Sequence, residues 1–379
     1  MSVLRAYYFY VFSYEFIFGY AIYTAYFSLQ GLSASEIGAI LAFWAGSVMV
    51  LELPSGALSD RYDRRILLII SPLIKSLCFI TWIFAGNEAW LYGLGFLFWS
   101  TGSALQSGTK EALLYEHIHA VKLGRSYEKL LGRERVFKTA GVMLGSALGG
   151  FISVYSMELA FWLSILPLIA ASFAARYLTD IRKHHPETPL TDSVPYAQTF
   201  KAALLEFKNH ADIRFITIFV TVGITILGAL EEFDQLFYQA VSLPVWAYGL
   251  VIAGVSLIHI FASANAYKLT GIKSLNWLLL VLSGLFLIAA GLVQNQISLI
   301  PFMLAYAVIA PLQVLADAKF QKTMEGKSRA TTTSALNLCI EAAAILYMLT
   351  FGFLIDILDV LPAYQIVGCY LMVFAIWVY

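Results

Sequence analysis

The chain has 379 residues, of which 60% are hydrophobic and 13% are charged, and its 24 basic and 24 acidic side chains give a net charge of zero. Because a soluble domain carries about 25% charged residues, this composition excludes a water-soluble globular protein. The zero net charge gives no electrostatic reason to expect a nucleic-acid partner. Apolar runs of about 20 residues recur along the chain, which predicts an all-α integral membrane protein embedded in a lipid bilayer.

The apolar runs predict twelve transmembrane helices in two six-helix halves. In chain order they are expected at residues 4–29, 37–58, 66–86, 91–114, 134–155, 158–178, 213–236, 247–268, 274–293, 298–318, 331–355 and 361–379. Residues 179–212 are polar and contain proline, so they are the expected cytoplasmic linker. The predicted domains are therefore an N-terminal half at 1–178, the linker at 179–212, and a C-terminal half at 213–379.

The distribution of Lys and Arg predicts the orientation of these helices, because short loops rich in these residues stay in the cytoplasm. With both termini cytoplasmic, the loops that carry basic residues fall on the cytoplasmic side, including those with Arg61, Arg64, Arg65, Lys122, Arg125, Lys129, Arg182, Lys183, Lys268, Lys273, Lys327 and Arg329. The outside loops contain no Lys or Arg, and the chain has no N-x-[ST] sequon. We therefore expect a multi-pass protein of a bacterial inner membrane.

The cytoplasmic turn between the second and third spans carries the densest charge in the chain, in the sequence SGALSDRYDRR. Asp60 is placed to face the N-terminus of a neighbouring helix, and Arg61, Arg64 and Arg65 are placed to pair with acids on adjacent helix ends. Together with Gly56 they form a candidate cytoplasmic gate. The alternative interpretation is that the arginines only anchor the loop on the cytoplasmic side.

The fifth span carries a row of glycines at Gly132, Gly141, Gly145, Gly149 and Gly150. Glycines four residues apart form a smooth groove on one face of a helix, which favours close packing of another helix. Close packing alone is one interpretation of this row, and a specialised role in transport is the other.

These two stretches resemble motifs of the major facilitator superfamily. Gly56 to Arg65 is similar to G-x-L-a-D-r-x-G-r-r, with Asp63 in place of the second Gly, and the glycine row is similar to G-x8-G-x3-G-P-x2-G-G, with Ser146 in place of Pro. The resemblance implies a gate in which Asp60 caps the N-terminus of the eleventh span, and an exporter that works as an antiporter. The span 4 arginine of many proton-coupled exporters is absent, because Ala104 stands at that position.

Two acids fall near the middle of predicted spans. Glu15 and Glu341 lie roughly 15 to 16 Å into spans 1 and 11, and an ionisable group at this depth is a functional candidate, here for proton coupling. Lys75 and Glu52 in spans 3 and 2 are expected to form a structural pair.

Polar side chains on four spans predict a water-filled substrate cavity near the midplane. The expected cavity residues are Ser103, Ser107, Glu111, Thr221, Thr225, Glu232, His259 and Asn337. The alternative is that the Ser and Thr hydroxyls bond back to their own helices and that His259 is a structural donor.

The leading hypothesis is a monomeric secondary active transporter that exports a small molecule by alternating access and proton antiport. Proton-coupled uptake of a metabolite or siderophore is the alternative, and a non-transporting receptor is a third. No G-x-S-x-G, H-E-x-x-H or Walker sequence is present, so we expect no enzyme activity and no cofactor. His184-His185 is interpreted as part of a solvated loop rather than as a metal site.

Overall fold

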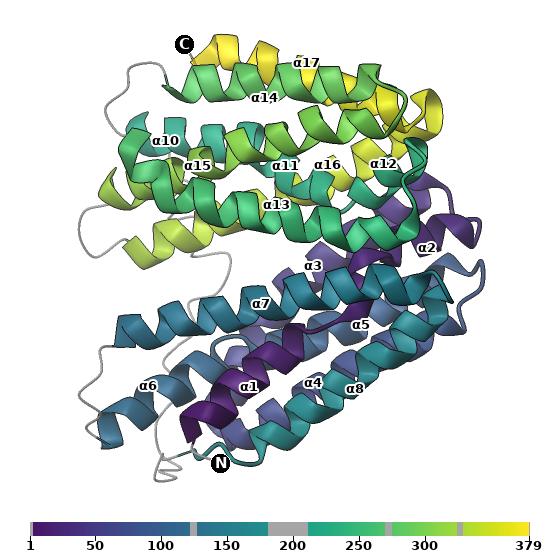
Figure 1. The fold of residues 1–379 in the computed structure, drawn as a ribbon. Helices are drawn as coiled ribbons and strands as arrows, with labels where there is room; N and C mark the ends of the chain where they lie inside the picture. Colours follow the sequence, from purple (N-terminus) through teal and green to yellow (C-terminus); the bar gives the residue numbers. More distant parts are fainter. Residues whose placement is uncertain (1–2, 122–126, 181–210, 270–274, 324–328, 379) are drawn as a thin grey trace. The chain divides into compact units, whose positions relative to one another are not determined.

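The computed structural model describes residues 3–121, 127–180, 211–269, 275–323 and 329–378. Over these ranges the secondary structure is helical, without a β-strand (Figure 1). Ten helices in the described residues are long and apolar enough to cross a membrane. The predicted first and fourth spans are not among the ten, because the first is broken and the fourth is rich in Gly, Ser and aromatic residues. The predicted all-α membrane fold is confirmed.

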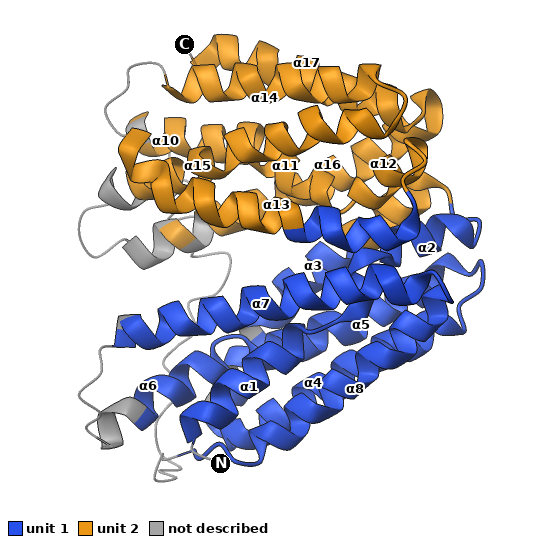
Figure 2. Ribbon diagram, in the orientation of Figure 1, with its two compact units in different colours: residues 1–32, 43–192, 244–253 blue, residues 33–42, 193–243, 254–379 orange. Residues whose placement is uncertain are grey.

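The chain forms two compact units, shown in Figure 2. Unit 1 comprises residues 1–32, 43–192 and 244–253, and unit 2 comprises residues 33–42, 193–243 and 254–379. The beginning of one long helix, residues 34–42, therefore groups with unit 2, and the beginning of another, residues 245–253, groups with unit 1. Residues 181–210, which include His184 and His185 of the expected linker, lie outside the described residues, so the division into two halves joined at 179–212 stays a prediction.

Unit 1 is a bundle of helices packed around aromatic side chains. Its elements are α1 (Val3–Glu15), η1 (Phe18–Ala21), α2 (Tyr23–Leu29), most of α3 (Ala34–Arg61), α4 (Arg64–Ile83), α5 (Ala89–Gln106), α6 (Thr109–Val121), α7 (Tyr127–Ser153) and α8 (Met157–Ala175). Helix α4 packs against α5 and α8, and α1 packs against α7 and α8. The fully buried indole of Trp82 lies among the rings of Phe27, Phe79 and Phe96.

Unit 2 contains a second set of apolar helices. They are α10 (Ala211–Ile218), η2 (Phe219–Ile224), α11 (Thr225–Glu231), α12 (Asp234–Ala240), the rest of α13 (Val245–Asn265), η3 (Ala266–Leu269), α14 (Leu275–Leu292), η4 (Gln296–Ser298), α15 (Leu299–Thr323), α16 (Arg329–Leu358) and α17 (Val360–Val378). Helices α14 and α17 approach closely at Gly284 and Gly368, where a Cβ on either would lie within 2.6 Å of the other's carbonyl oxygen. Small residues at such crossings let two membrane helices touch along their backbones.

The first span is not the single helix expected over 4–29. Helix α1 ends at Glu15, Ile17 is extended with φ −113° and ψ 120°, and the chain continues as the short 3₁₀ helix η1 and then α2. The run of aromatic and β-branched residues around Gly19 has low helix propensity, which lowers the cost of the break. The amide of Gly19 donates to the hydroxyl of Ser164 at 3.1 Å, so a side chain of α8 satisfies a backbone group that the broken helix leaves free.

Span 7 is also irregular. Residues Phe219–Ile224 form a π-helical segment between α10 and α11. The carbonyl of Val222 accepts hydrogen bonds from the hydroxyls of Tyr347 and Tyr370, both at 2.8 Å. Side chains of α16 and α17 therefore satisfy a carbonyl inside this segment, which stabilises an otherwise unfavourable helical geometry.

Candidate functional site

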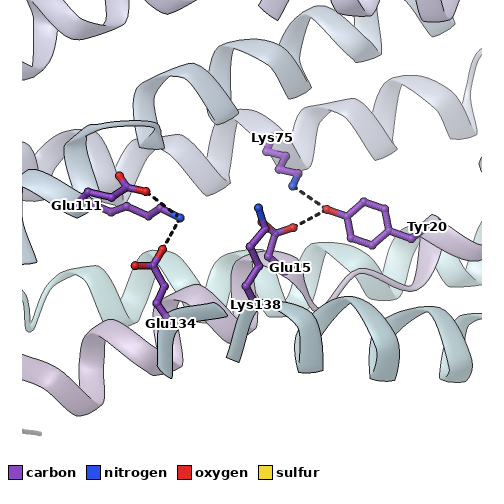
Figure 3. A network of polar contacts seen from close by, with 7 residues as sticks. Glu15, Tyr20, Lys75, Glu111, Glu134 and Lys138 are labelled. Atoms are coloured by element: carbon purple, nitrogen blue, oxygen red, sulfur yellow. Dashed lines mark hydrogen bonds and ion pairs between the residues drawn. The ribbon is translucent and has the colours of Figure 1, made fainter. Parts of the chain in front are cut away.

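Glu15 stands at the C-terminal end of α1, where the helix breaks. Its carboxylate accepts a hydrogen bond from the hydroxyl of Tyr20 at 2.8 Å, and the ammonium of Lys138 lies 3.8 Å away (Figure 3). The Glu15 side chain is 13% exposed and that of Lys138 is 53% exposed. The break therefore places a shielded carboxylate beside an accessible cation.

Lys75 is linked to the same carboxylate through Tyr20. The Lys75 ammonium donates to the Tyr20 hydroxyl at 3.3 Å and lies 4.2 Å and 4.3 Å from the ring centroids of Tyr14 and Trp99. The residue is 1% exposed, so the aromatic faces supply much of the electrostatic environment that water would otherwise give.

The expected pair between Lys75 and Glu52 is wrong. Glu52 is exposed on α3, whereas the Lys75 ammonium contacts Tyr20 and the two rings. Counting depth along two helices placed both charges at a similar level, but Tyr20 of η1 offers the lysine a polar partner, and the rings of Tyr14 in α1 and Trp99 in α5 offer cation–π contacts.

A second charged cluster lies between α6, α7 and α1. The Lys110 ammonium is 2.8 Å from one oxygen of Glu134 and 3.4 Å from Glu111, and the Tyr7 hydroxyl donates to the other Glu134 oxygen at 2.6 Å. The Lys110 and Glu134 side chains are 9% and 8% exposed. Both oxygens of Glu134 are thus bonded, which is the condition under which a buried ion pair is tolerated.

In the charged turn, Arg64 makes the strongest contact. Its guanidinium lies 2.6 Å from Glu116 of α6, and its backbone amide donates to Asp180 at 2.9 Å. An arginine of this turn therefore pairs with an acid on another helix, as one of the two sequence interpretations expected. All of these residues belong to unit 1.

Asp63, which departs from the family pattern, is the N-cap of α4. Its side chain accepts a hydrogen bond from the amide of Arg65 at 2.8 Å, and its φ of −58° requires no glycine. Arg61 and Arg65 are exposed, and a Cβ at Gly56 would meet no atom within 4 Å. The side chain of Asp60 lies outside the described residues, so its capping role stays a prediction.

The glycine row of α7 packs against the broken first span. A Cβ at Gly141 would lie 2.6 Å from the carbonyl oxygen of Phe12, one at Gly145 would lie 2.7 Å from the amide nitrogen of Ile17, and one at Gly149 would meet the carbonyl oxygen of Phe18. A Cβ at Gly150 would lie 2.7 Å from the carbonyl oxygen of Trp246, whereas one at Gly132 would meet no atom within 4 Å. Four of the five glycines thus make a backbone contact.

The expected substrate-cavity residues are divided between the two units. Unit 1 contains Ser103, Ser107 and Glu111, and unit 2 contains Thr221, Thr225, Glu232, His259 and Asn337. The Thr225 hydroxyl bonds back to the carbonyl of Val220 at 3.0 Å, which is the local bonding considered as the alternative. Ser107 and Asn337 are exposed, and Glu341 is partly buried in α16 of unit 2.

An acid near the outer end of span 7 is buried in unit 2. Asp234 is 6% exposed and accepts hydrogen bonds from the hydroxyls of Tyr306 at 2.8 Å and Tyr364 at 3.2 Å. In the sequence, Asp234 clusters with Glu231 and Glu232 near the outer end of span 7, a pattern that fits an outer gate or a site for cationic cargo as well as ordinary solvated charges. The tyrosines that bury Asp234 come from α15 and α17, and the sequence near Asp234 does not predict these contacts.

The sequence model of the Major Facilitator Superfamily, a protein family, matches residues 4–348 of this chain. Multidrug resistance protein MdtH of Proteus mirabilis is 24% identical over 162 residues, which cover 41% of this chain and 39% of that protein. The uncharacterized MFS-type transporter MJ1560 of Methanocaldococcus jannaschii is 20% identical over 347 residues, covering 88% of this chain and 86% of that protein.

Solved structures share the fold at low sequence identity. The nucleoside transporter NupG superposes with a TM-score of 0.83 at 13% identity, covering 100% of this chain and 98% of that chain. A D-xylose-proton symporter superposes with a TM-score of 0.73 at 14% identity, covering 99% and 96%. With ten membrane-length helices in the described residues and a family match across nearly its whole length, the chain belongs to the major facilitator superfamily and is a multi-pass membrane transporter.

Proposed function

We propose that this transporter exports a small molecule by alternating access and proton antiport, acting as a monomer in a bacterial inner membrane. The observation that carries the proposal is the position of Glu15 at the break of the first span, bonded to Tyr20 and 3.8 Å from Lys138. Discontinuous membrane helices supply the ion and substrate sites of many transporters.

Lys138 provides a reason to place water next to Glu15. Lys138 lies four residues into the predicted span 134–155, about 6 Å along the helix axis, and its side chain is 53% exposed. Lipid does not solvate an ammonium group, so we infer that this accessible lysine draws water to the place where it meets Glu15. Protons and a polar cargo would reach the Glu15 carboxylate through the same water.

Antiport follows from competition at this carboxylate. The ionised Glu15 carboxylate attracts the Lys138 ammonium and accepts a hydrogen bond from the Tyr20 hydroxyl. A proton on Glu15 removes this negative charge. Loss of the proton restores a site that a polar or cationic group of the cargo can occupy. Alternation between a protonated and a cargo-bound Glu15 would couple inward proton flow to outward cargo flow, with Glu341 of α16 as a second candidate carboxylate.

Export is favoured over uptake by the similarity of the α7 glycine row to the motif of antiporters and by the partial match to a multidrug resistance protein. Proton-coupled uptake is the second candidate, since one structural neighbour is described as a proton symporter. The residues Ser103, Ser107, Glu111, Thr221, Thr225, Glu232, His259 and Asn337 remain the proposed cargo contacts.

The test uses the purified protein in proteoliposomes with a pH-sensitive dye inside. A proton gradient is imposed, pools of metabolites, siderophores and lipophilic cations are added, and cargo-induced proton flux is recorded. Glu15→Gln is expected to reduce coupled flux at least tenfold, because the amide keeps the shape of the side chain but cannot carry the proton.

Glu52→Gln is the matched control, since Glu52 is an exposed acid of α3 outside the Glu15 contacts. Its flux should equal that of the parent protein. Undiminished flux in Glu15→Gln would remove Glu15 from the mechanism. Cargo accumulation in the same direction as the proton gradient would replace antiport by symport.

A further inference from the structure

The N-terminus of α3 is bonded to an acid from the far end of the chain. The amides of Ala34 and Ser35 donate to the two carboxylate oxygens of Asp356, each at 2.9 Å, across 322 and 321 sequence positions. The first amides of a helix have no partner within the helix and carry the positive end of its dipole, so a carboxylate there is favourable in both hydrogen bonding and charge.

The same helix end has a local cap of its own. Ser33 and Glu36 form a reciprocal capping box, in which the Glu36 carboxylate accepts from the Ser33 amide at 2.8 Å and the Glu36 amide donates to the Ser33 hydroxyl at 3.2 Å. Helix α3 therefore has the means to begin at this point without Asp356. The two hydrogen bonds to Asp356 therefore serve mainly to hold α3 against α16.

Below these hydrogen bonds the two helices touch along their backbones. A Cβ at Gly38 would collide with the carbonyl oxygen of Met348, and a Cβ at Gly352 would collide with the carbonyl oxygen of Ala34. Asp356 follows Gly352 by one helical turn, so the carboxylate closes the end of a glycine-lined contact. These segments of α3 and α16 all belong to unit 2.

The distribution of basic residues places this contact at the outer side of the membrane. Helix α3 starts after the loop that follows the first span, and α16 ends before the loop that leads to the last span; both loops lack Lys and Arg. The two helices come from different predicted halves of the chain. In a transporter that rocks one half against the other, a bond at this place resists opening to the outside.

We propose that Asp356 is a positioning residue of the transport cycle, which holds the beginning of α3 on the end of α16 and so keeps the outer ends of these helices together. This role rests on the alternating access of the proposed function. Asp356 touches no cargo and carries no proton in this assignment. Asp356 stabilises the outer-closed state relative to the outer-open state. Removing its charge should therefore raise the population of the outer-open state.

The test measures accessibility from outside. A single cysteine replaces Met348, which is 5% exposed and whose backbone carbonyl meets Gly38 of α3, in a chain whose three native cysteines have been replaced by serine. Intact cells are treated with a membrane-impermeant maleimide and the labelling rate is measured. Asp356→Asn, which loses one acceptor oxygen and the charge, is expected to raise this rate about three- to tenfold, the range that the loss of a charged helix cap supplies.

Asp359→Asn is the matched control. Asp359 lies three residues further on, is exposed, and has a left-handed φ of 70° that asparagine adopts readily. Among the contacts of the described residues its side chain bonds to nothing on α3. Removing its charge should leave the labelling of Met348→Cys unchanged, and Asp356→Glu should restore part of the protection because it returns both the charge and the second oxygen.

Equal labelling of Asp356→Asn and its parent would overturn the proposal, as would equal increases in Asp356→Asn and Asp359→Asn. A second reporter separates opening from unfolding: native Cys78 alone, which is 0% exposed in unit 1, should stay unlabelled in every variant. Labelling of both reporters in Asp356→Asn would show loss of the fold and would also reject the positioning role. The measurement needs neither cargo nor a proton gradient, so a failure of proton antiport would leave its result interpretable.

Discussion

At the scale of single residues, the buried pair of Lys110 and Glu134 gives a direct prediction for stability. The two side chains are 2.8 Å apart and less than a tenth exposed, so Lys110→Met leaves an unpaired buried carboxylate. The expected loss is about 3 kcal/mol, seen as a lower unfolding temperature in detergent. The double variant Lys110→Met with Glu134→Leu should recover part of this loss, although Tyr7 then lacks its acceptor.

The pair Asp63 and Arg65 serves as the exposed comparison. Its charged atoms are 3.5 Å apart and its side chains are 25% and 45% exposed, so loss of the arginine in Arg65→Met should cost well under 1 kcal/mol. An equal fall in unfolding temperature for Lys110→Met and Arg65→Met would contradict the account of the buried pair.

The same scale sets the limit of what the sequence predicts about the site. Glu15 is recognisable from its depth, because rise per residue converts position into distance along a helix. Its partners are not recognisable, because Tyr20 reaches back across a break and Lys138 belongs to another helix. The burial of Asp234 is not recognisable for the same reason, since Tyr306 and Tyr364 lie 72 and 130 positions away.

At the scale of helices, the contact between α7 and the first span predicts which glycines matter. Gly145→Val should destabilise the protein by roughly 2 kcal/mol or prevent its accumulation, because the new side chain would overlap the backbone of Ile17. Gly132→Val, on the same helix but with open space around it, should accumulate normally. Fluorescence-detected size-exclusion chromatography after heating compares the two, and equal behaviour would remove the packing argument.

The breaks within helices explain why the first and seventh spans were predicted less well than the others. Hydrophobic run length locates a span, but it does not distinguish a continuous helix from one interrupted at Ile17 or widened over Phe219–Ile224. Both irregular segments are held by side chains from elsewhere, Ser164 in the first case and Tyr347 with Tyr370 in the second. Such partners become adjacent only after the helices pack.

At the scale of the whole molecule, the orientation predicted from Lys and Arg can be tested by labelling. Asn87 and Arg176 are both exposed at helix ends, and the predicted topology places Asn87 outside and Arg176 in the cytoplasm. Asn87→Cys should react with an impermeant maleimide in intact cells, whereas Arg176→Cys should react only after permeabilisation. The opposite pattern would invert the topology and move the Asp356 contact to the cytoplasmic side.

Composition and motifs predicted the family because both can be read from neighbouring residues, without knowing how the helices pack. Apolar runs gave the helical membrane class, and the stretch from Gly56 to Arg65 with the α7 glycine row gave the resemblance that the match over residues 4–348 confirms. Cargo and direction of transport depend on a few side chains arranged by packing, so they remain proposals.

The π-helical segment at Phe219–Ile224 affects how span 7 would respond to the loss of one residue. A π turn accommodates about one residue more than an α turn, and each residue of an α-helix advances the direction of the side chain by about 100°. Deleting one residue within the segment would therefore restore an α turn at this point, and the side chains after it would keep about their present directions. A deletion elsewhere in the span would instead rotate every later side chain by about 100° and turn Asp234 away from Tyr306 and Tyr364. The π-helical segment is therefore the place where span 7 can lose one residue and still keep its buried acid.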